Sequence, residues 1–229
     1  MGHYTGRVSE IRLEVGGQLE VCINCPTEAV PATGQYLLAS DTADPMAILG
    51  TPLFISEKTQ RGFWANPTYP ISWGPGTELD LMGPLGYGFN LPRNLQRLGL
   101  IAMGETVSRL KPLIHSVAQV HTSITLFTDL SLPRLPAALE VSPLALLKEA
   151  LDWPDFMALD VPSTQISELR SVFGITDSAS LPCPAQVLIT TPMPCAGLAK
   201  CGACAVHARR GWKFACEDGP VFDLSILQW

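Results

Sequence analysis

The chain has few charged residues, no long hydrophobic run and no excess of basic residues. These absences exclude several classes of protein. Only 16% of its 229 residues are charged, yet no apolar run approaches the roughly 20 residues of a membrane-spanning helix. The formal net charge of −6 argues against a general nucleic-acid binder, because such proteins are basic. The N-terminus has no basic segment followed by an apolar block, so we expect no secretory signal and a cytoplasmic location.

Common catalytic signatures are also missing. No GxSxG, HExxH or Walker pattern occurs, and these patterns are the usual marks of hydrolases, zinc proteases and phosphate-binding loops. The histidines form no metal-binding spacing with one another or with acids; they are His3, His115, His121 and His207. We therefore assign no catalytic residue and leave open whether the chain is itself an enzyme.

Turn-forming residues are abundant, with 20 prolines and 19 glycines, which argues against a helical bundle. Over the first 82 residues they separate short apolar segments, a pattern typical of an antiparallel barrel or sandwich. We predict a flavin-type β-barrel over residues 1–90. Its expected strands are Arg7–Leu13, Leu19–Ile23, Gln35–Ala39, Ala47–Ile55, Tyr69–Trp73 and Glu78–Met82.

The pattern changes after Pro92 to alternating strands and helices, which indicates a parallel α/β sheet. We predict a nucleotide-binding-like α/β domain over residues 91–190. Expected strands are Leu98–Met103, Thr122–Phe127, Phe156–Leu159 and Gln186–Thr190. Expected helices are Glu105–Val120, with Pro112 as a kink or limit, Pro143–Leu151, and Ser163–Phe173 with Ser163 as its N-cap.

Four of the seven cysteines lie close together in residues 191–229, spaced C-x5-C-x2-C-x11-C: Cys195, Cys201, Cys204 and Cys216. Four thiolates are what a [2Fe-2S] cluster requires, so we predict a small cluster-binding region here. A structural zinc is the alternative, but zinc ribbons usually pair two CxxC knuckles and this segment has one. A third hypothesis is that the four cysteines bind no metal. Cys22, Cys25 and Cys183 read as core or structural residues.

Charge is unevenly distributed along the chain. Residues 200–213 contain four basic and no acidic residues, so the other 215 residues carry −10. Such a patch reads as solvated surface, as a docking site, or as a bias on a nearby anionic cofactor.

Several motifs resemble those of a known family. Residues 31–36 (PATGQY) resemble a PGQF/Y barrel segment, residues 51–56 (TPLFIS) a flavin-binding RPxSI segment, and residues 83–89 (GPLGYGF) a GPLGxGF joint between domains. Residues 216–222 (CEDGPVF) resemble the end of a cluster domain. The chain thus resembles the electron-transfer subunit of NAD-linked, two-subunit dihydroorotate dehydrogenases, within the ferredoxin–NADP reductase superfamily.

The resemblance implies a flavin barrel, a nucleotide-binding α/β domain and a [2Fe-2S] domain. In that family, electrons pass from the flavin mononucleotide of a catalytic partner through the cluster to FAD and then NAD, within pyrimidine biosynthesis. Carried over by position, Ser56 and Gly86 would contact FAD.

Three positions depart from the family pattern. Thr51 stands where the family has an arginine that pairs with a flavin phosphate, and threonine cannot supply that charged fork. The segment that cradles the flavin pyrophosphate, expected before Gly76–Met82, is missing. The nucleotide loop keeps only Gly104, and Glu105 places a negative charge where a phosphate would bind. We therefore expect the cluster, leave FAD binding open, and expect no productive NAD binding.

The leading functional hypothesis is an electron-transfer subunit that relays electrons from a flavoprotein partner, such as a dihydroorotate dehydrogenase-like catalytic subunit, through the cluster. Two alternatives stay open: a complete FAD-containing NAD(P)H reductase, and a non-catalytic scaffold or redox sensor on a degraded reductase fold.

Overall fold

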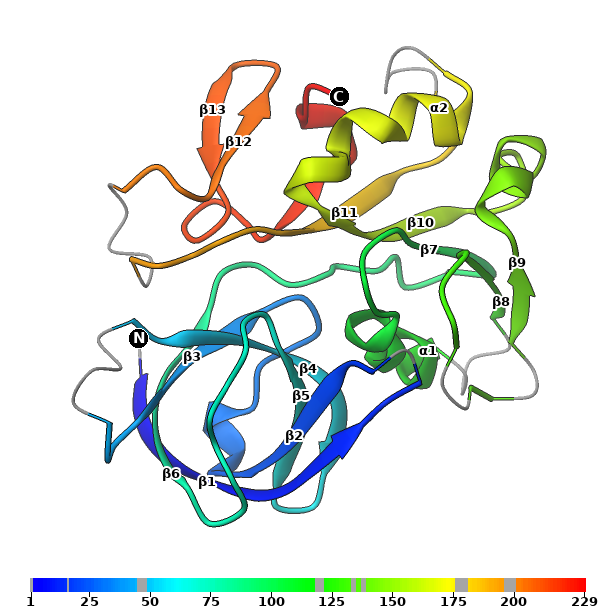
Figure 1. Ribbon diagram of the computed structural model, residues 1–229. Coiled ribbons are helices and arrows are strands. Elements are labelled where there is room, and N and C mark those ends of the chain that lie inside the picture. The colour runs from blue at the N-terminus through cyan, green and yellow to red at the C-terminus, as the bar shows by residue number, and fades with distance from the viewer. Residues whose placement is uncertain are drawn as a thin grey trace.

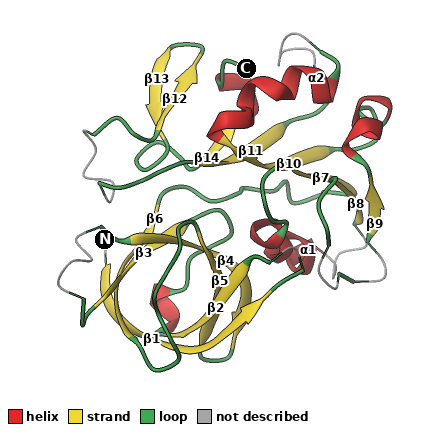
Figure 2. Cartoon of the chain, in the orientation of Figure 1, coloured by secondary structure: helices red, strands yellow, loops and turns green. Residues whose placement is uncertain are grey.

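A β-barrel and an open β-sheet form the two halves of the protein (Figure 1). The computed structural model describes residues 2–15, 17–44, 49–117, 122–132, 135–136, 139–175, 181–195 and 201–229. Strands dominate and helices are few and short (Figure 2). No helix in these ranges is long and apolar enough to cross a membrane.

The N-terminal half is a closed six-stranded antiparallel barrel, as predicted. Its strands follow the order β1-β2-β5-β4-β3-β6. Their bounds are β1 Gly2–Leu13, β2 Leu19–Asn24, β3 Tyr36–Asp41, β4 Thr51–Thr59, β5 Gly62–Pro67 and β6 Glu78–Leu85. In β6, buried Leu79 and Leu81 alternate with exposed Glu78 and Asp80. One face of each strand therefore fills the barrel, as the twofold side-chain period requires. The short helix η1 (Thr27–Ala29) lies between β2 and β3.

One predicted barrel strand is wrong. Tyr69–Trp73 forms no strand, and the strand that closes the barrel there is β5, which the prediction omitted. Pro70 has no amide hydrogen to donate to a ladder, while Ile71 and Trp73 still pack against the barrel core. The apolar pattern of this stretch therefore reflects packing and not strand pairing. The predicted strand at Ala47–Ile55 begins at Thr51, and residues 45–48 lie outside the described part.

The second half is a six-stranded sheet in the order β14-β11-β10-β7-β8-β9. The first five strands along the chain run parallel: β7 Arg97–Ala102, β8 Ser123–Phe127, β9 Glu140–Ser142, β10 Phe156–Pro162 and β11 Ala185–Thr190. The prediction of a parallel α/β sheet is confirmed. β14 (Val221–Asp223), which follows Cys216, adds an antiparallel edge to β11. Residues from the cysteine-rich segment thus complete this sheet.

The predicted helices are present but shorter, and much of their length is 3-10 helix. Glu105–Val120 reduces to η2 (Ser108–Leu110) and α1 (Lys111–Val117), and residues 118–121 are outside the described part. The other two become η3 (Leu144–Glu149) and η4 (Ser163–Glu168) with α2 (Leu169–Phe173).

Two details of these helices follow from proline chemistry. Ser163 is not an N-cap, because Pro162 occupies that position and no side chain caps the helix. Pro112 lies in the first turn of α1, where its missing amide hydrogen removes no helical hydrogen bond.

A helical segment packs against the barrel, and a hairpin lies near the C-terminus. η2 and α1 contact β4 of the barrel, and Figure 1 shows α1 between the barrel and the sheet. The C-terminal segment forms a hairpin, β12 (Ala205–Ala208) and β13 (Gly211–Phe214), followed by β14 and η6 (Leu224–Ile226).

Candidate metal centre and the crevice between barrel and sheet

Cys204 and Cys216 face each other at the base of the β12–β13 hairpin. Their sulfur atoms lie 3.2 Å apart, and the residues are 1% and 5% exposed. This distance is far longer than the roughly 2.05 Å of a disulfide. A tetrahedral metal with metal–sulfur bonds of about 2.3 Å holds two thiolates about 3.8 Å apart. The pair is thus close to the spacing of two ligands on one metal ion.

The other two cysteines of the motif flank the same site. Cys195 is half-buried and interacts with the Cys216 thiol. Cys201 is exposed, and residues 196–200, which connect it to Cys195, lie outside the described part. Among the described residues, no three ligand-type side chains form a ready metal site. The structure therefore brings Cys204 and Cys216 together, and Cys195 interacts with Cys216.

Burial governs the chemistry of these thiols. Burial raises the pKa of Cys216 well above its ordinary value, and its neighbours Cys204 and Cys195 raise it further. A bound metal ion reverses this balance, since it holds its ligands as thiolates. Buried, facing thiols without a disulfide are a donor set that fits a thiolate-bound iron–sulfur cluster.

Three sequence motifs meet at the segment that carries Cys216. Gly86, with a φ of +71°, packs so closely on residues 219–220 that an added Cβ would lie 2.5 Å from the Gly219 carbonyl oxygen. Gly34 is equally confined by Val221, which would lie 2.5 Å from its Cβ. The Tyr87 amide donates to the Gly219 carbonyl at 2.6 Å. The two barrel motifs and the end of the cysteine motif therefore form one joint.

Tyr36 connects the barrel directly to this joint. Its side chain is fully buried, and its hydroxyl donates a hydrogen bond of 3.2 Å to the Cys216 carbonyl. Tyr36 and Phe54 belong to the same hydrophobic core as Cys204 and Cys216. Burial raises the pKa of the Tyr36 hydroxyl, so it remains a donor. The sequence signalled Tyr36 only as part of the PATGQY segment, and its contact with a cysteine 180 positions away was not predicted.

Comparison with known proteins agrees with this geometry. Residues 191–228 match the family model of the iron–sulfur cluster binding domain of dihydroorotate dehydrogenase B. The chain is 25% identical to the electron transfer subunit of dihydroorotate dehydrogenase B (NAD(+)) from Desulforamulus reducens, over 88% of this chain and 87% of that protein. The chain is a relative of that electron-transfer subunit.

Several solved structures share this fold. An NADH-dependent reduced ferredoxin–NADP oxidoreductase matches with a TM-score of 0.74 and 18% identity, over 98% of this chain and 90% of that one. The ferredoxin reductase of carbazole 1,9a-dioxygenase gives 0.58 and 18%, over 76% and 65%. The flavohaem-like FAD/NAD binding domain of a nitric oxide dioxygenase from Vibrio cholerae gives 0.56 and 13%, over 82% and 99%. The chain therefore has the ferredoxin reductase-like fold.

The two predicted flavin contacts both pack against other parts of the protein. Ser56 on β4 is fully buried, its hydroxyl has no hydrogen-bond partner, and η2 and α1 cover this strand. Gly86 packs on Gly219 and Pro220, and its carbonyl accepts a hydrogen bond of 3.0 Å from the Gln35 side chain. These residues, in this arrangement, do not fit a flavin.

A second obstacle to a flavin lies beside β5. A cavity of about 380 Å³ opens at residues 67–71, after β5 and before the strand at which the family's pyrophosphate segment was expected. Its described lining includes Glu105 and contains no lysine or arginine. A pyrophosphate here would meet a carboxylate and no opposite charge, which is unfavourable.

On the barrel side of β10, the space at the switch point of the sheet is filled. The switch point lies at β7, because β8 neighbours this strand on one side and β10 on the other. In open α/β sheets, ligands bind at such a point, outside the carboxyl ends of the strands. Here Arg109 of η2 donates to Asp160 of β10 at 2.8 Å and to Asn66 of β5 at 3.1 Å. Arg109 is 6%, Asp160 0% and Asn66 3% exposed. We call these three residues the Arg109 cluster.

The Arg109 cluster ties sheet, helix and barrel together. Burial raises the pKa of Asp160 and the Arg109 guanidinium opposes that rise. A second set of ion pairs lies nearby, where Lys111 of α1 pairs with Glu14 and Arg12 pairs with Glu20. None of these residues was singled out from the sequence, because each is an ordinary polar residue until the fold brings it to the crevice.

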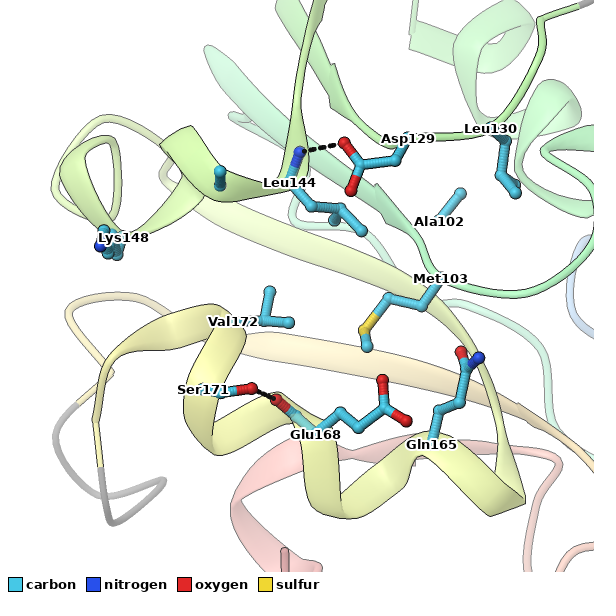
Figure 3. A pocket seen from close by; sticks show the side chains of 11 residues that line it. Ala102, Met103, Asp129, Leu130, Leu144, Lys148, Gln165, Glu168, Ser171 and Val172 are labelled. Atoms are coloured by element: carbon cyan, nitrogen blue, oxygen red, sulfur yellow. Dashed lines mark hydrogen bonds between the residues drawn. The ribbon is translucent and has the colours of Figure 1, made fainter.

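A cavity of about 570 Å³ lies at the carboxyl ends of β7 and β8, and residues of η4 and α2, which follow β10, also line it (Figure 3). Figure 3 shows Glu168 and Gln165 facing Met103, with Asp129 across the cavity. One Asp129 oxygen already accepts from the Leu144 amide at 3.1 Å. Lys148 is the cation among the described lining residues, against two carboxylates. The arrangement does not favour nucleotide phosphates.

The remaining cysteines lie elsewhere. Cys22 is buried in β2, opposite Trp64 of β5. Cys25 and Cys183 are half-buried, and burial raises the pKa of each thiol to about 11, with smaller contributions from Cys22 and Asp155 respectively. Thiols with such pKa values stay protonated and unreactive near neutral pH.

Proposed function

We propose that this protein is an iron–sulfur electron-transfer protein whose working centre is a [2Fe-2S] cluster. The observation that carries the proposal is the buried, unbridged pair Cys204 and Cys216, 3.2 Å apart. Cys195 interacts with the same site. The segment that holds them matches an iron–sulfur cluster binding domain.

The proposed ligands are Cys195, Cys201, Cys204 and Cys216. The cluster supplies one-electron transfer, which no side chain of this protein provides. The protein buries the ligands Cys204 and Cys216. It also holds residues 216–221 through the joint with the barrel and through the Tyr36 hydrogen bond to Cys216. Cys201, which is exposed, is the proposed fourth ligand.

The proposed division of the chain is a barrel over residues 1–90, an α/β domain over residues 91–190 and a cluster-binding region over residues 191–229. In this scheme the first two regions support the third. The Arg109 cluster fills the crevice between them, and Ser56 is enclosed. NAD reduction is therefore not part of the proposed function.

The proposed electron donor is a flavoprotein that resembles the catalytic subunit of dihydroorotate dehydrogenase B, because the curated relative is named as the electron transfer subunit of that enzyme. Such a role would belong to pyrimidine biosynthesis. We propose a cytoplasmic location, since clustered free thiols need a reducing compartment.

The test is metal, sulfide and flavin analysis of the anaerobically purified protein with its visible spectrum. We expect about two irons and two sulfides per chain, a reddish-brown colour and a rhombic electron paramagnetic resonance signal after reduction. Cys216→Ser should lose the colour, whereas Cys183→Ser, the matched control outside the motif, should keep it. A colourless protein with one zinc per chain would refute the proposal. Releasable FAD with NADH-dependent dye reduction would favour a complete reductase instead.

A further inference from the structure

A hairpin projects from the base of the proposed cluster site. β12 begins directly after Cys204, and β13 ends two residues before Cys216. The Cys204 carbonyl accepts a hydrogen bond of 3.0 Å from the Ala215 amide. On one side of the hairpin, buried Val206 and Ala208 pack on the protein. We call residues 205–214 the Trp212 hairpin.

The opposite side of the hairpin presents an exposed aromatic pair. Trp212 is 63% exposed, whereas Trp64, Trp73 and Trp229 are at most 9% exposed. Its ring stacks on His207, the residue opposite it in the register, with centroids 4.8 Å apart. The stacking holds the indole in place before any partner arrives, which lowers the entropy cost of binding. Tryptophan and arginine are the residues that most often dominate binding energy in protein interfaces.

Basic residues neighbour Trp212 in the hairpin sequence. The turn of the hairpin is Arg209-Arg210, and both residues are exposed. Lys213 pairs with Asp218 at 2.7 Å, whereas Arg210 forms no ion pair with an acid among the described residues. The rest of the protein is acidic. The hairpin is thus a basic, aromatic projection on an acidic protein.

A second exposed aromatic residue flanks the same cysteine. Tyr87 is 64% exposed, and its amide donates to the Gly219 carbonyl, three residues after Cys216. Trp212 precedes Cys216 by four residues. The two most exposed aromatic side chains of the described chain therefore border the segment that carries Cys216.

We propose that the Trp212 hairpin is the docking surface for the flavoprotein that exchanges electrons with the cluster. The partner presents an apolar pocket for the indole, surrounded by acidic side chains that pair with Arg210. The proposal rests on the proposed function, because a partner must approach the cluster closely for electrons to pass. A symmetric dimer through this surface is disfavoured, since it would place the same basic hairpin on both sides.

The test measures binding of the holoprotein to the FMN-containing catalytic subunit of dihydroorotate dehydrogenase B by isothermal titration calorimetry. Trp212→Ala should weaken binding at least about tenfold, as for a central aromatic anchor. Arg210→Glu should weaken binding and reduce the dependence of the affinity on ionic strength. The matched controls are Leu146→Ala, which removes an exposed apolar side chain elsewhere, and Arg61→Glu at the β4–β5 turn. Both should bind like the parent.

The outcomes separate the docking proposal from the proposed function. All four variants should keep the cluster spectrum and melting temperature of the parent, since each side chain is exposed. Parent-like binding by Trp212→Ala and Arg210→Glu would overturn the docking proposal and leave the electron-transfer role intact. Failure of the parent to bind would overturn this docking surface together with the choice of partner. Loss of self-association in Trp212→Ala would assign the hairpin to a second copy instead. A parent without a cluster spectrum would refute the proposed function itself.

Discussion

Replacing Arg109 by glutamine should destabilise the protein strongly, because it leaves Asp160 buried without its cation. Arg109 lies 2.8 Å from Asp160 and 3.1 Å from Asn66, and all three are almost fully buried. Removing one partner of a buried pair costs about 3–5 kcal/mol. In a protein of this size, that corresponds to a fall in melting temperature of about 6–20 °C. The measurement is thermal unfolding followed by circular dichroism.

Measuring the melting temperature at several pH values distinguishes the loss of this ion pair from simple misfolding. Burial raises the pKa of Asp160 and Arg109 opposes the rise, so the variant raises it further. The folded variant then holds a proton that the unfolded chain releases above its ordinary pKa of 3.8. Stability therefore falls as pH rises through this window, and the deficit of Arg109→Gln relative to the parent should shrink in acid. The double variant Arg109→Gln/Asp160→Asn, which carries no buried charge, should recover part of the loss.

Arg97→Gln is the matched control, since Arg97 also pairs with an aspartate, Asp155, at 2.7 Å but near the surface. An exposed pair contributes little, so this variant should melt close to the parent. Equal losses for the two arginine variants would refute the reasoning. Stoichiometric binding of added FAD by the parent, with a higher melting temperature, would show that the crevice is open and would also refute it.

Two further predictions follow from the joint and from the ion pairs near α1. Gly86→Ala should impair cluster incorporation, measured by iron content, because its Cβ would meet the Gly219 carbonyl at 2.5 Å; Gly17→Ala has a similar positive φ with open space around it and should retain full iron content. The pKa of Glu14 is lowered from 4.5, because burial, which raises it, is outweighed mainly by the hydrogen bond from Lys111. Its stabilisation is present above pH 4.5 and is lost as pH falls through the lower folded value. The melting temperature of the parent should thus fall more steeply below pH 4.5 than that of Glu14→Gln, and parallel curves would contradict the assignment.

The sequence predicted a strand well where the hydrophobic pattern of that strand alone is enough to identify it. Alternating Leu79 and Leu81 on β6 and the continuous apolar run of β7 are properties of single strands. β5 was missed because its short apolar stretch lies between Gly62 and Pro67, which read as turn residues. The helices were overestimated, since apolar spacing does not distinguish 3-10 from α-helix over six residues.

The site was predictable only in part, for a related reason. The cysteine spacing is a local pattern and indicated the metal-binding segment directly. The closed crevice depends on Arg109, Asp160 and Asn66, which are 51 and 43 positions apart along the chain. No periodicity links them. Sequence reasoning could note that Glu105 disfavours a phosphate, but not that an arginine nearby fills the space.

The residues that depart from the family pattern and those that keep it lie in different places. This distribution supports a role that depends on the iron–sulfur cluster. Thr51 and Glu105, where the pattern is broken, lie at positions that would meet flavin or nucleotide phosphates. Gly34, Tyr36 and Gly86, where the pattern is kept, all contact residues 216–221. A protein that needed the barrel to bind FAD would require both groups of residues. One that needs the barrel to hold the cysteine segment requires only the second, and that is the group this chain retains.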